Sequence, residues 1–135
     1  MDNRSSLLLS TRPIIPSAKV HENMSSDERF QNLTLRPVLK MQNALLIEAF
    51  KNYINKHKGS FYDYNTEKKL SFIENAVQRD IKFRNSLKGM LIGVFTVDEY
   101  LLYIKNSSAL NKRMMKMVIE RLKDQVQLFD IDHVA

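Results

Sequence analysis

Helical signals are strongest in the stretch TVDEYLLYIKNSSALNKRMMKMVIERLKDQVQLF, residues 96–129. Its first four residues match a capping box, in which a threonine side chain accepts from the backbone N–H three residues on and a glutamate there accepts from the threonine N–H. Thr96 and Glu99 occupy these two positions. We therefore expect a helix from Val97 to about Lys105.

A longer helix follows in the same stretch. Asn106-Ser107-Ser108 interrupts the first helix and supplies N-cap side chains for the next, which we expect to run from Ser108 to about Phe129. Every fourth residue of this segment is apolar, the spacing of one face of a helix. The row consists of Leu110, Met114, Val118, Leu122 and Val126. We predict that it is buried in a core.

Two more long helices are expected before this stretch. The first runs from Pro37 to His57, with proline at an early helical position and Gly59 beyond its end. The second runs from Thr66 to Lys88, where Gly89 stops or bends it. Residues 90–95 could form a short strand, but no partner strand is evident, so they are assigned to no element. The predicted buried positions of the two helices are Leu39, Leu46, Phe50, Tyr53, Ile54, Leu70, Ile73, Val77 and Ile81.

The N-terminal residues 1–25 are expected to form a leader without regular structure, because Arg12-Pro13-Ile14-Ile15-Pro16 favours extended backbone. Two interpretations stay open: a disordered tail, or a segment that orders on a partner through its leucines and isoleucines. A short helical turn capped by Ser26 follows. The expected domains are the leader (1–25), a helical domain (26–129) and a C-terminal tail (130–135).

Composition favours one fold class. The 135 residues include 3 Gly and 3 Pro, which leaves little turn chemistry for a many-stranded sheet. We predict an all-α fold: a small helical bundle of three long and one or two short helices with an extended N-terminal leader. The chain has no cysteine and no apolar run long enough to span a bilayer, so we expect a cytoplasmic protein without disulfides.

No motif indicates catalysis or a cofactor. The three histidines have no second ligand at metal-like spacing, and no phosphate-binding glycine loop occurs. We expect no metal, no cofactor, no small-molecule substrate and no enzymatic activity. An enzyme would require Glu48, Glu74, Asp80 or His57 to gather in one pocket.

Charge is the feature that indicates a partner. Residues 36–129 carry 17 Lys and Arg against 9 Asp and Glu, whereas residues 1–35 carry 4 of each. A basic helical body favours an acidic partner, and structured RNA is the leading candidate. The predicted nucleic-acid contacts are Lys51, Lys56, Lys58, Arg79, Lys82, Arg84, Lys88, Lys112, Arg113, Lys116 and Arg12.

Two other functions remain open. A DNA-binding helix-turn-helix would pair the helices of residues 97–105 and 108–129 and present Asn111, Lys112 and Met115 to a groove. A protein–protein adaptor would use Leu7–Leu9, Ile14-Ile15 and an apolar helix face.

The segments Phe83–Gly89 and Asn106–Met114 resemble a lineage-restricted family of small helical bacterial proteins, with similarity from about Leu35 to Phe129. Such proteins are sometimes labelled glyoxalases, but this chain lacks the paired βαβββ units and the metal-binding His and Glu of that fold. The family is also similar to lineage-specific accessory proteins of the large ribosomal subunit. The resemblance implies that rRNA and neighbouring ribosomal proteins are the partners.

Overall fold

The structure, a computed structural model, describes residues 2–57 and 60–129, and no strand occurs among them. The prediction of an all-α helical bundle is confirmed. The predicted C-terminal tail and the predicted contact Lys58 lie outside the described residues.

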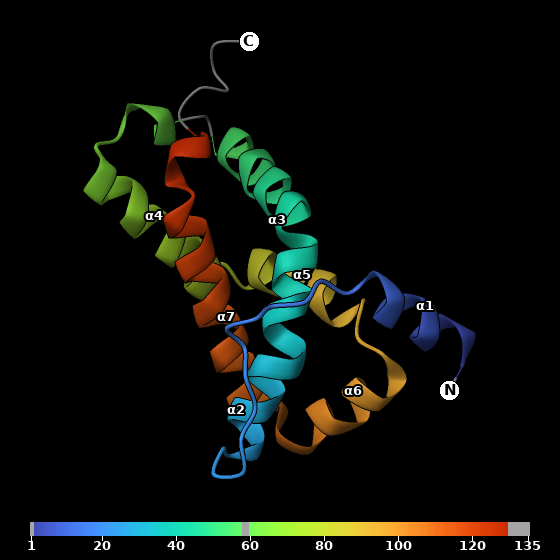
Figure 1. The fold of residues 1–135 in the computed structure, drawn as a ribbon. Coiled ribbons are helices and arrows are strands. Elements are labelled where there is room, and N and C mark those ends of the chain that lie inside the picture. The colour runs from blue at the N-terminus through green and yellow to red at the C-terminus, as the bar shows by residue number, and fades with distance from the viewer. Residues whose placement is uncertain (1, 58–59, 130–135) are drawn as a thin grey trace. The chain divides into compact units, whose positions relative to one another are not determined.

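Helices and short helical turns follow one another along the chain. In order they are α1 (Asn3–Thr11), α2 (Ser26–Phe30), a π-helical turn (Gln31–Leu35), α3 (Arg36–Lys56), a 3-10 turn (Ser60–Asp63), α4 (Thr66–Arg79), α5 (Ile81–Ile92), α6 (Val97–Tyr103), a second 3-10 turn (Ile104–Asn106), α7 (Ser107–Asp124) and a third 3-10 turn (Val126–Phe129) (Figure 1).

The chain divides into two compact units. Unit 1 comprises residues 1–43 and 88–114, and unit 2 comprises residues 44–87 and 115–135. These boundaries differ from the predicted division into a leader and one helical domain, because the N-terminal segment belongs to unit 1 and helices α3, α5 and α7 supply residues to both units.

The capping box forms as the sequence predicts. The Thr96 hydroxyl accepts from the Glu99 N–H at 3.1 Å, and a Glu99 carboxylate oxygen accepts from the Thr96 N–H at 2.8 Å. Helix α6 ends at Tyr103 rather than Lys105, and a 3-10 turn leads from it into α7. The expected break at residues 106–108 is therefore a tightening of the helix and not a free loop.

Helix α3 is confirmed close to its predicted bounds, but it is the continuation of α2 and not a separate start. Pro37 has no N–H, and in an α-helix its ring would collide with the carbonyl four residues earlier. The π-helical turn widens the helix just before this proline, and the Arg36 N–H bonds to the carbonyl of Gln31, five residues back. Pro37 thus explains why the turn is there.

The N-terminal segment differs from its prediction. The expectation of no regular structure is wrong for α1, since the Asp2 carboxylate caps this helix by accepting from the Ser5 N–H at 2.8 Å. The short helix α2 is capped by Ser25, not by Ser26, and Ser25 accepts from the Glu28 N–H at 3.1 Å.

The predicted helix of residues 66–88 is two helices. Asp80 leaves the helical conformation and accepts from the Phe83 N–H at 3.2 Å, so it acts as the N-cap of α5. Because of this break, the buried face of α4 does not continue onto Ile81 at the start of α5. Ile81 was predicted to be buried, but it is 60% exposed. Gly89 does not stop the helix, because α5 continues to Ile92, and residues 90–92 are helical.

We expect Asp80→Ala to lower the free energy of unfolding by about 1–2 kcal/mol, the usual cost of losing an N-cap. The Tyr53 hydroxyl also donates to Asp80 at 2.9 Å. Burial first, and then this bond and the negative charge, raise the pKa of Tyr53 to about 12. Ultraviolet titration of the variant should therefore show one tyrosine with a lower pKa.

Asp124→Ala is the control for that variant, because Asp124 is exposed at the end of α7. It should leave the tyrosine titration unchanged and should change the free energy of unfolding by no more than about 0.5 kcal/mol. An unchanged titration curve in Asp80→Ala would contradict the assigned bond.

Each unit has its own apolar core. The core of unit 2 is built around the fully buried Phe50, whose ring lies 4.9 Å from that of Phe129 and 5.9 Å from that of Phe61. The rings of Tyr53, Phe72 and Phe83 lie within 6.2 Å of it. In unit 1 the buried side chains include Phe30, Leu35, Val38, Leu39, Leu91, Phe95, Tyr103, Leu110 and Met114.

Candidate functional site

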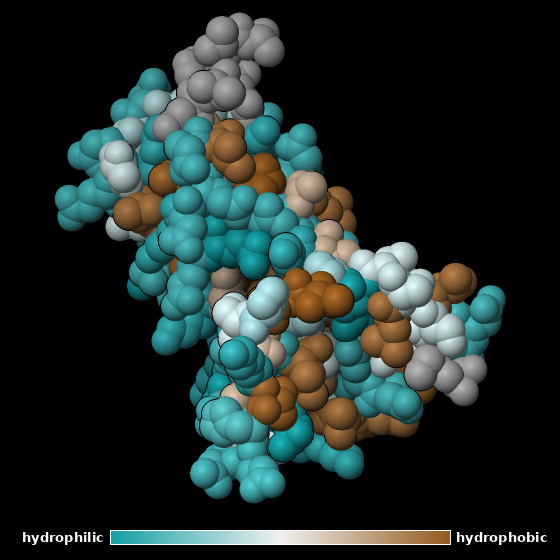
Figure 2. Space-filling model, viewed as in Figure 1, coloured by the Kyte–Doolittle hydropathy of each residue, from teal (hydrophilic) through white to brown (hydrophobic). Residues whose placement is uncertain are grey.

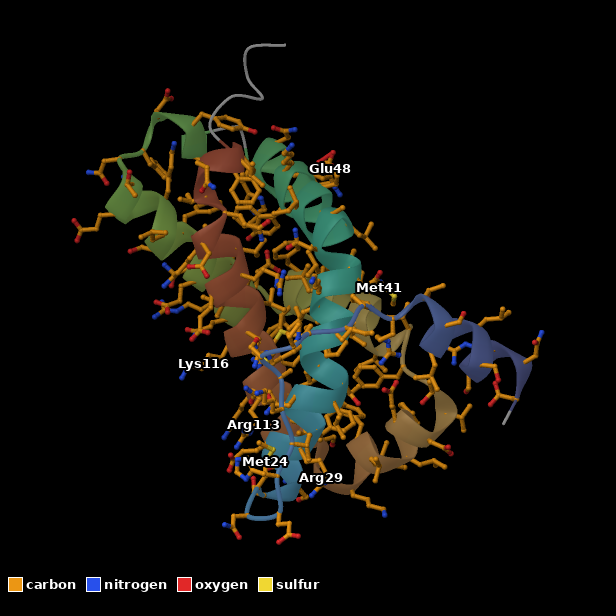
Figure 3. All side chains as sticks on the ribbon, in the orientation of Figure 1. Met24, Arg29, Met41, Glu48, Arg113 and Lys116 are labelled. Carbon is orange, nitrogen blue, oxygen red and sulfur yellow. The ribbon has the colours of Figure 1, made fainter. Side chains whose placement is uncertain are left out.

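Four of the predicted RNA contacts are exposed on unit 2. They come from the end of α3, the end of α4, the start of α5 and the middle of α7, and we call them the unit 2 cation set: Lys56, Arg79, Lys82 and Lys116. Among the described residues, no ion pair involves these side chains. Figure 3 shows Lys116 extending away from α7, and Figure 2 shows a mostly hydrophilic surface over α4 and α7. These positive charges are available to an anionic partner.

The remaining predicted contacts differ in availability. Lys112 is exposed on unit 1, whereas Arg84 and Lys88 are half-buried. Lys51 pairs with Glu48 at 3.5 Å. The Arg113 guanidinium donates to the side chain of Gln31 at 2.8 Å. Two of the predicted RNA contacts, Lys51 and Arg113, therefore already have partners within the chain.

Arg12 is a correction to the predicted surface. Its guanidinium donates to both carboxylate oxygens of Glu99, at 2.8 and 3.0 Å, and to the carbonyl of Val94 at 3.1 Å. The side chains of Arg12 and Glu99 are only 7% and 13% exposed. Arg12 therefore holds the N-terminal segment to α6 and is not presented to an RNA.

Glu99 carries more contacts than the capping box predicts. Besides the Thr96 N–H and Arg12, it accepts from the Thr34 hydroxyl at 3.0 Å. Burial raises the pKa of Glu99, but the bonds from Arg12, Thr96 and Thr34 together outweigh burial and hold the pKa below its ordinary value. Glu99 is thus ionised at neutral pH and joins three segments of unit 1.

The N-terminal helix makes further contacts within unit 1. Arg4 donates to the carbonyls of Phe95 and Gly93, at 2.8 and 2.7 Å, and the Ser5 hydroxyl accepts from the Val97 N–H at 3.2 Å. The prediction of a segment that orders on a partner therefore needs revision, because this segment already packs on its own chain.

The helix-turn-helix alternative loses two of its three proposed base contacts. Met115 is only 3% exposed, and Asn111 accepts a hydrogen bond from the Tyr103 hydroxyl. Only Lys112 remains exposed. Helix α7 begins at Ser107, so Lys112 lies more than one turn from the helix start and outside the first turn, where the helix dipole acts on charges.

An exposed apolar face lies on unit 1. Five apolar side chains in and just after α6 are 45–54% exposed: Val97, Tyr100, Leu101, Leu102 and Ile104. Leu7, Leu9 and Ile14 of the N-terminal segment are exposed as well. Figure 2 shows hydrophobic side chains at the surface around α6 and α1. Contiguous apolar surface of this kind is typical of interaction sites.

A groove adjoins this face. It has a volume of about 190 Å³ and is lined by residues of α2, the π-helical turn, α6, the following 3-10 turn and α7: Ser26, Asp27, Arg29, Phe30, Leu33, Thr34, Leu102, Lys105, Asn106 and Leu110. All of these residues belong to unit 1. No local sequence pattern indicates the groove, because its walls come from segments distant in the chain.

Of the four residues that an enzyme would require, the structure brings Asp80 and His57 near one another, whereas Glu48 and Glu74 pair with separate lysines. Glu48 is exposed on α3 (Figure 3), and Glu74 is exposed and pairs with Lys123 at 3.4 Å. Asp80 and His57 both contact Tyr53, whose hydroxyl donates to Asp80 at 2.9 Å and whose ring stacks on that of His57 at 4.1 Å. Within the described residues, no group of three or more His, Cys, Asp or Glu could hold a metal ion. No described helix is long and apolar enough to cross a membrane.

Comparison of the chain with family models, curated proteins and solved structures finds no match. The resemblance to small helical bacterial proteins therefore stays a prediction, and any function assigned to the chain depends on its own geometry.

Proposed function

We propose that this chain is a non-enzymatic, cytoplasmic component of a ribonucleoprotein that binds structured RNA, with rRNA as the leading candidate. The observation that carries the proposal is the unit 2 cation set, whose side chains are exposed and have no ion-pair partner among the described residues. Lysine and arginine side chains of this kind bind phosphates and fix the position of a protein on RNA. The resemblance to accessory proteins of the large ribosomal subunit supports the same partner.

The charge of the whole chain favours the proposal as well. The formal net charge is +6, and the sequence pI is about 9.6. Phosphate binding releases counterions, so affinity for RNA should fall steeply as salt rises. Recognition by backbone and shape requires no aromatic stacking motif, which agrees with the sequence.

We expect Lys82→Gln with Lys116→Gln to weaken binding to a fluorescein-labelled RNA hairpin. Loss of two phosphate contacts should reduce the slope of log affinity against log salt by about 1.4–1.8. Fluorescence anisotropy over a salt series measures both quantities. Both residues are exposed on unit 2, so the fold should be retained.

The matched control is Lys19→Gln with Lys40→Gln, which removes the same charge from exposed positions of unit 1. This variant should keep most of the slope. Equal losses in both variants would show that only net charge matters and would overturn the assigned surface. In cells, the protein should sediment with ribosomal particles and leave them at high salt.

A second candidate function is that of a protein–protein adaptor. The apolar face around α6 supports it, since five exposed apolar side chains within eight residues are costly to leave in water. The two functions are compatible, because a ribonucleoprotein component can contact RNA and protein with different surfaces.

A further inference from the structure

The groove of unit 1 has the size of an anchor site. Its volume is about 190 Å³, below the roughly 300–1,000 Å³ of typical small-molecule sites. Phe30, Leu33, Leu102 and Leu110 supply apolar lining. A cavity of this size can hold one large apolar side chain, the kind of residue that dominates the energy of many protein interfaces.

The charged side chains of the groove favour an acidic ligand. Arg29 and Lys105 line it, both are exposed, and no described residue pairs with either one (Figure 3 labels Arg29). Asp27 is the acidic residue in the lining, and its two carboxylate oxygens accept from the Asn106 amide at 3.1 and 3.0 Å. Asp27 is thereby held by Asn106, whereas the two cations remain open to carboxylates from outside.

The surface beside the groove is also apolar. Leu102 and Lys105 both line the groove, and Leu101 and Ile104 alternate with them along the same helical segment, each about half exposed. Such a surface fits a peptide or helix that places one apolar side chain in the groove and keeps further apolar contacts outside it.

We propose that this groove binds an acidic segment of a partner protein, with one leucine or aromatic side chain held in the groove and carboxylates paired with Arg29 and Lys105. This inference depends on the second candidate function, protein binding, and does not depend on RNA binding. Charge complementarity gives specificity and faster association, and the buried apolar side chain gives most of the affinity.

The probes for a test are three blocked pentapeptides, Glu-Glu-Leu-Glu-Glu, Lys-Lys-Leu-Lys-Lys and Glu-Glu-Ser-Glu-Glu, added to the ¹⁵N-labelled full chain. We expect the first to shift amide signals of groove residues such as Leu33, Leu102 and Leu110. The second should bind at least about tenfold more weakly because of its charge, and the third because it has no apolar anchor. Equal shifts with all three peptides would overturn the proposal.

Charge-reversal variants make the test specific. Arg29→Glu with Lys105→Glu should reverse the preference between the glutamate and lysine peptides, whereas Lys19→Glu with Lys40→Glu, the same change in charge away from the groove lining, should not. If both variants lose binding equally, the attraction is unspecific. Leu102→Ser tests the apolar lining separately and should weaken the leucine peptide alone.

The same samples separate this proposal from RNA binding. A chain that binds the RNA hairpin and none of the peptides refutes the groove proposal only. A chain that binds the leucine peptide at the groove and not the hairpin refutes the RNA proposal only.

Discussion

Replacing Phe50 with alanine should lower the free energy of unfolding by about 3–5 kcal/mol, the usual cost of removing a buried phenylalanine from a core. The side chain of Phe50 is fully buried, and five aromatic rings of unit 2 surround it. The substitution removes the transfer free energy of the ring and leaves a cavity that these rigid neighbours fill only in part. Denaturant unfolding followed by circular dichroism measures the loss.

The control for this variant lies in the same helix. Leu45 of α3 is 48% exposed, so Leu45→Ala should cost no more than about 0.5–1 kcal/mol. Near-ultraviolet circular dichroism should report the loss of aromatic packing in Phe50→Ala only. Similar losses in the two variants would contradict the central position of Phe50.

Replacing Glu99 with glutamine should cost about 3 kcal/mol, the low end of the range for breaking a buried ion pair. The amide keeps the shape of the side chain but leaves the Arg12 guanidinium, which is 7% exposed, without its counter-charge. The capping box also loses its ionic acceptor. Asp98→Asn is the matched control, since Asp98 is an exposed acid in the first turn of the same helix, and it should cost less than about 1 kcal/mol.

The effect of Glu99→Gln should depend on pH. The pKa of Glu99 in the folded protein lies below its ordinary value, so the stabilisation is complete above the ordinary value and is lost as the pH falls through the folded pKa. The difference in stability between wild type and variant should therefore be large near pH 7 and should shrink near pH 3. A difference that stays constant over this range would exclude the ionised pair as its cause.

The sequence predicted those helix starts and buried faces that depend on residues close together in the chain. The capping box placed the start of α6 correctly because its two hydrogen bonds lie within four residues. The spacing predicted burial correctly for Leu110, Met114, Val118 and Leu122. The fifth member of the row, Val126, is only half-buried, because α7 ends at Asp124 and not near Phe129 as predicted. The break at Asp80 was missed because the apolar spacing continues across it, although an aspartate three residues before Phe83 is a recognisable N-cap signal.

The candidate sites were less predictable because they depend on contacts between distant residues. The sequence shows that Arg12 and Arg113 are positive, but it does not show that Glu99 and Gln31 are their partners. Separating the exposed cations from those that bind internally requires the fold. The groove likewise exists only when α2, α6 and α7 come together.

The π-helical turn before Pro37 makes the orientation of α2 depend on the number of residues in the turn. A π-helical turn contains one residue more than an α-helical turn, and each residue rotates an α-helix by about 100°. Deleting one residue between Gln31 and Leu35 would therefore turn the face of α2 away from its present neighbours and dismantle the wall that Phe30 and Leu33 form. In related chains, this extra residue and the proline should be gained or lost together.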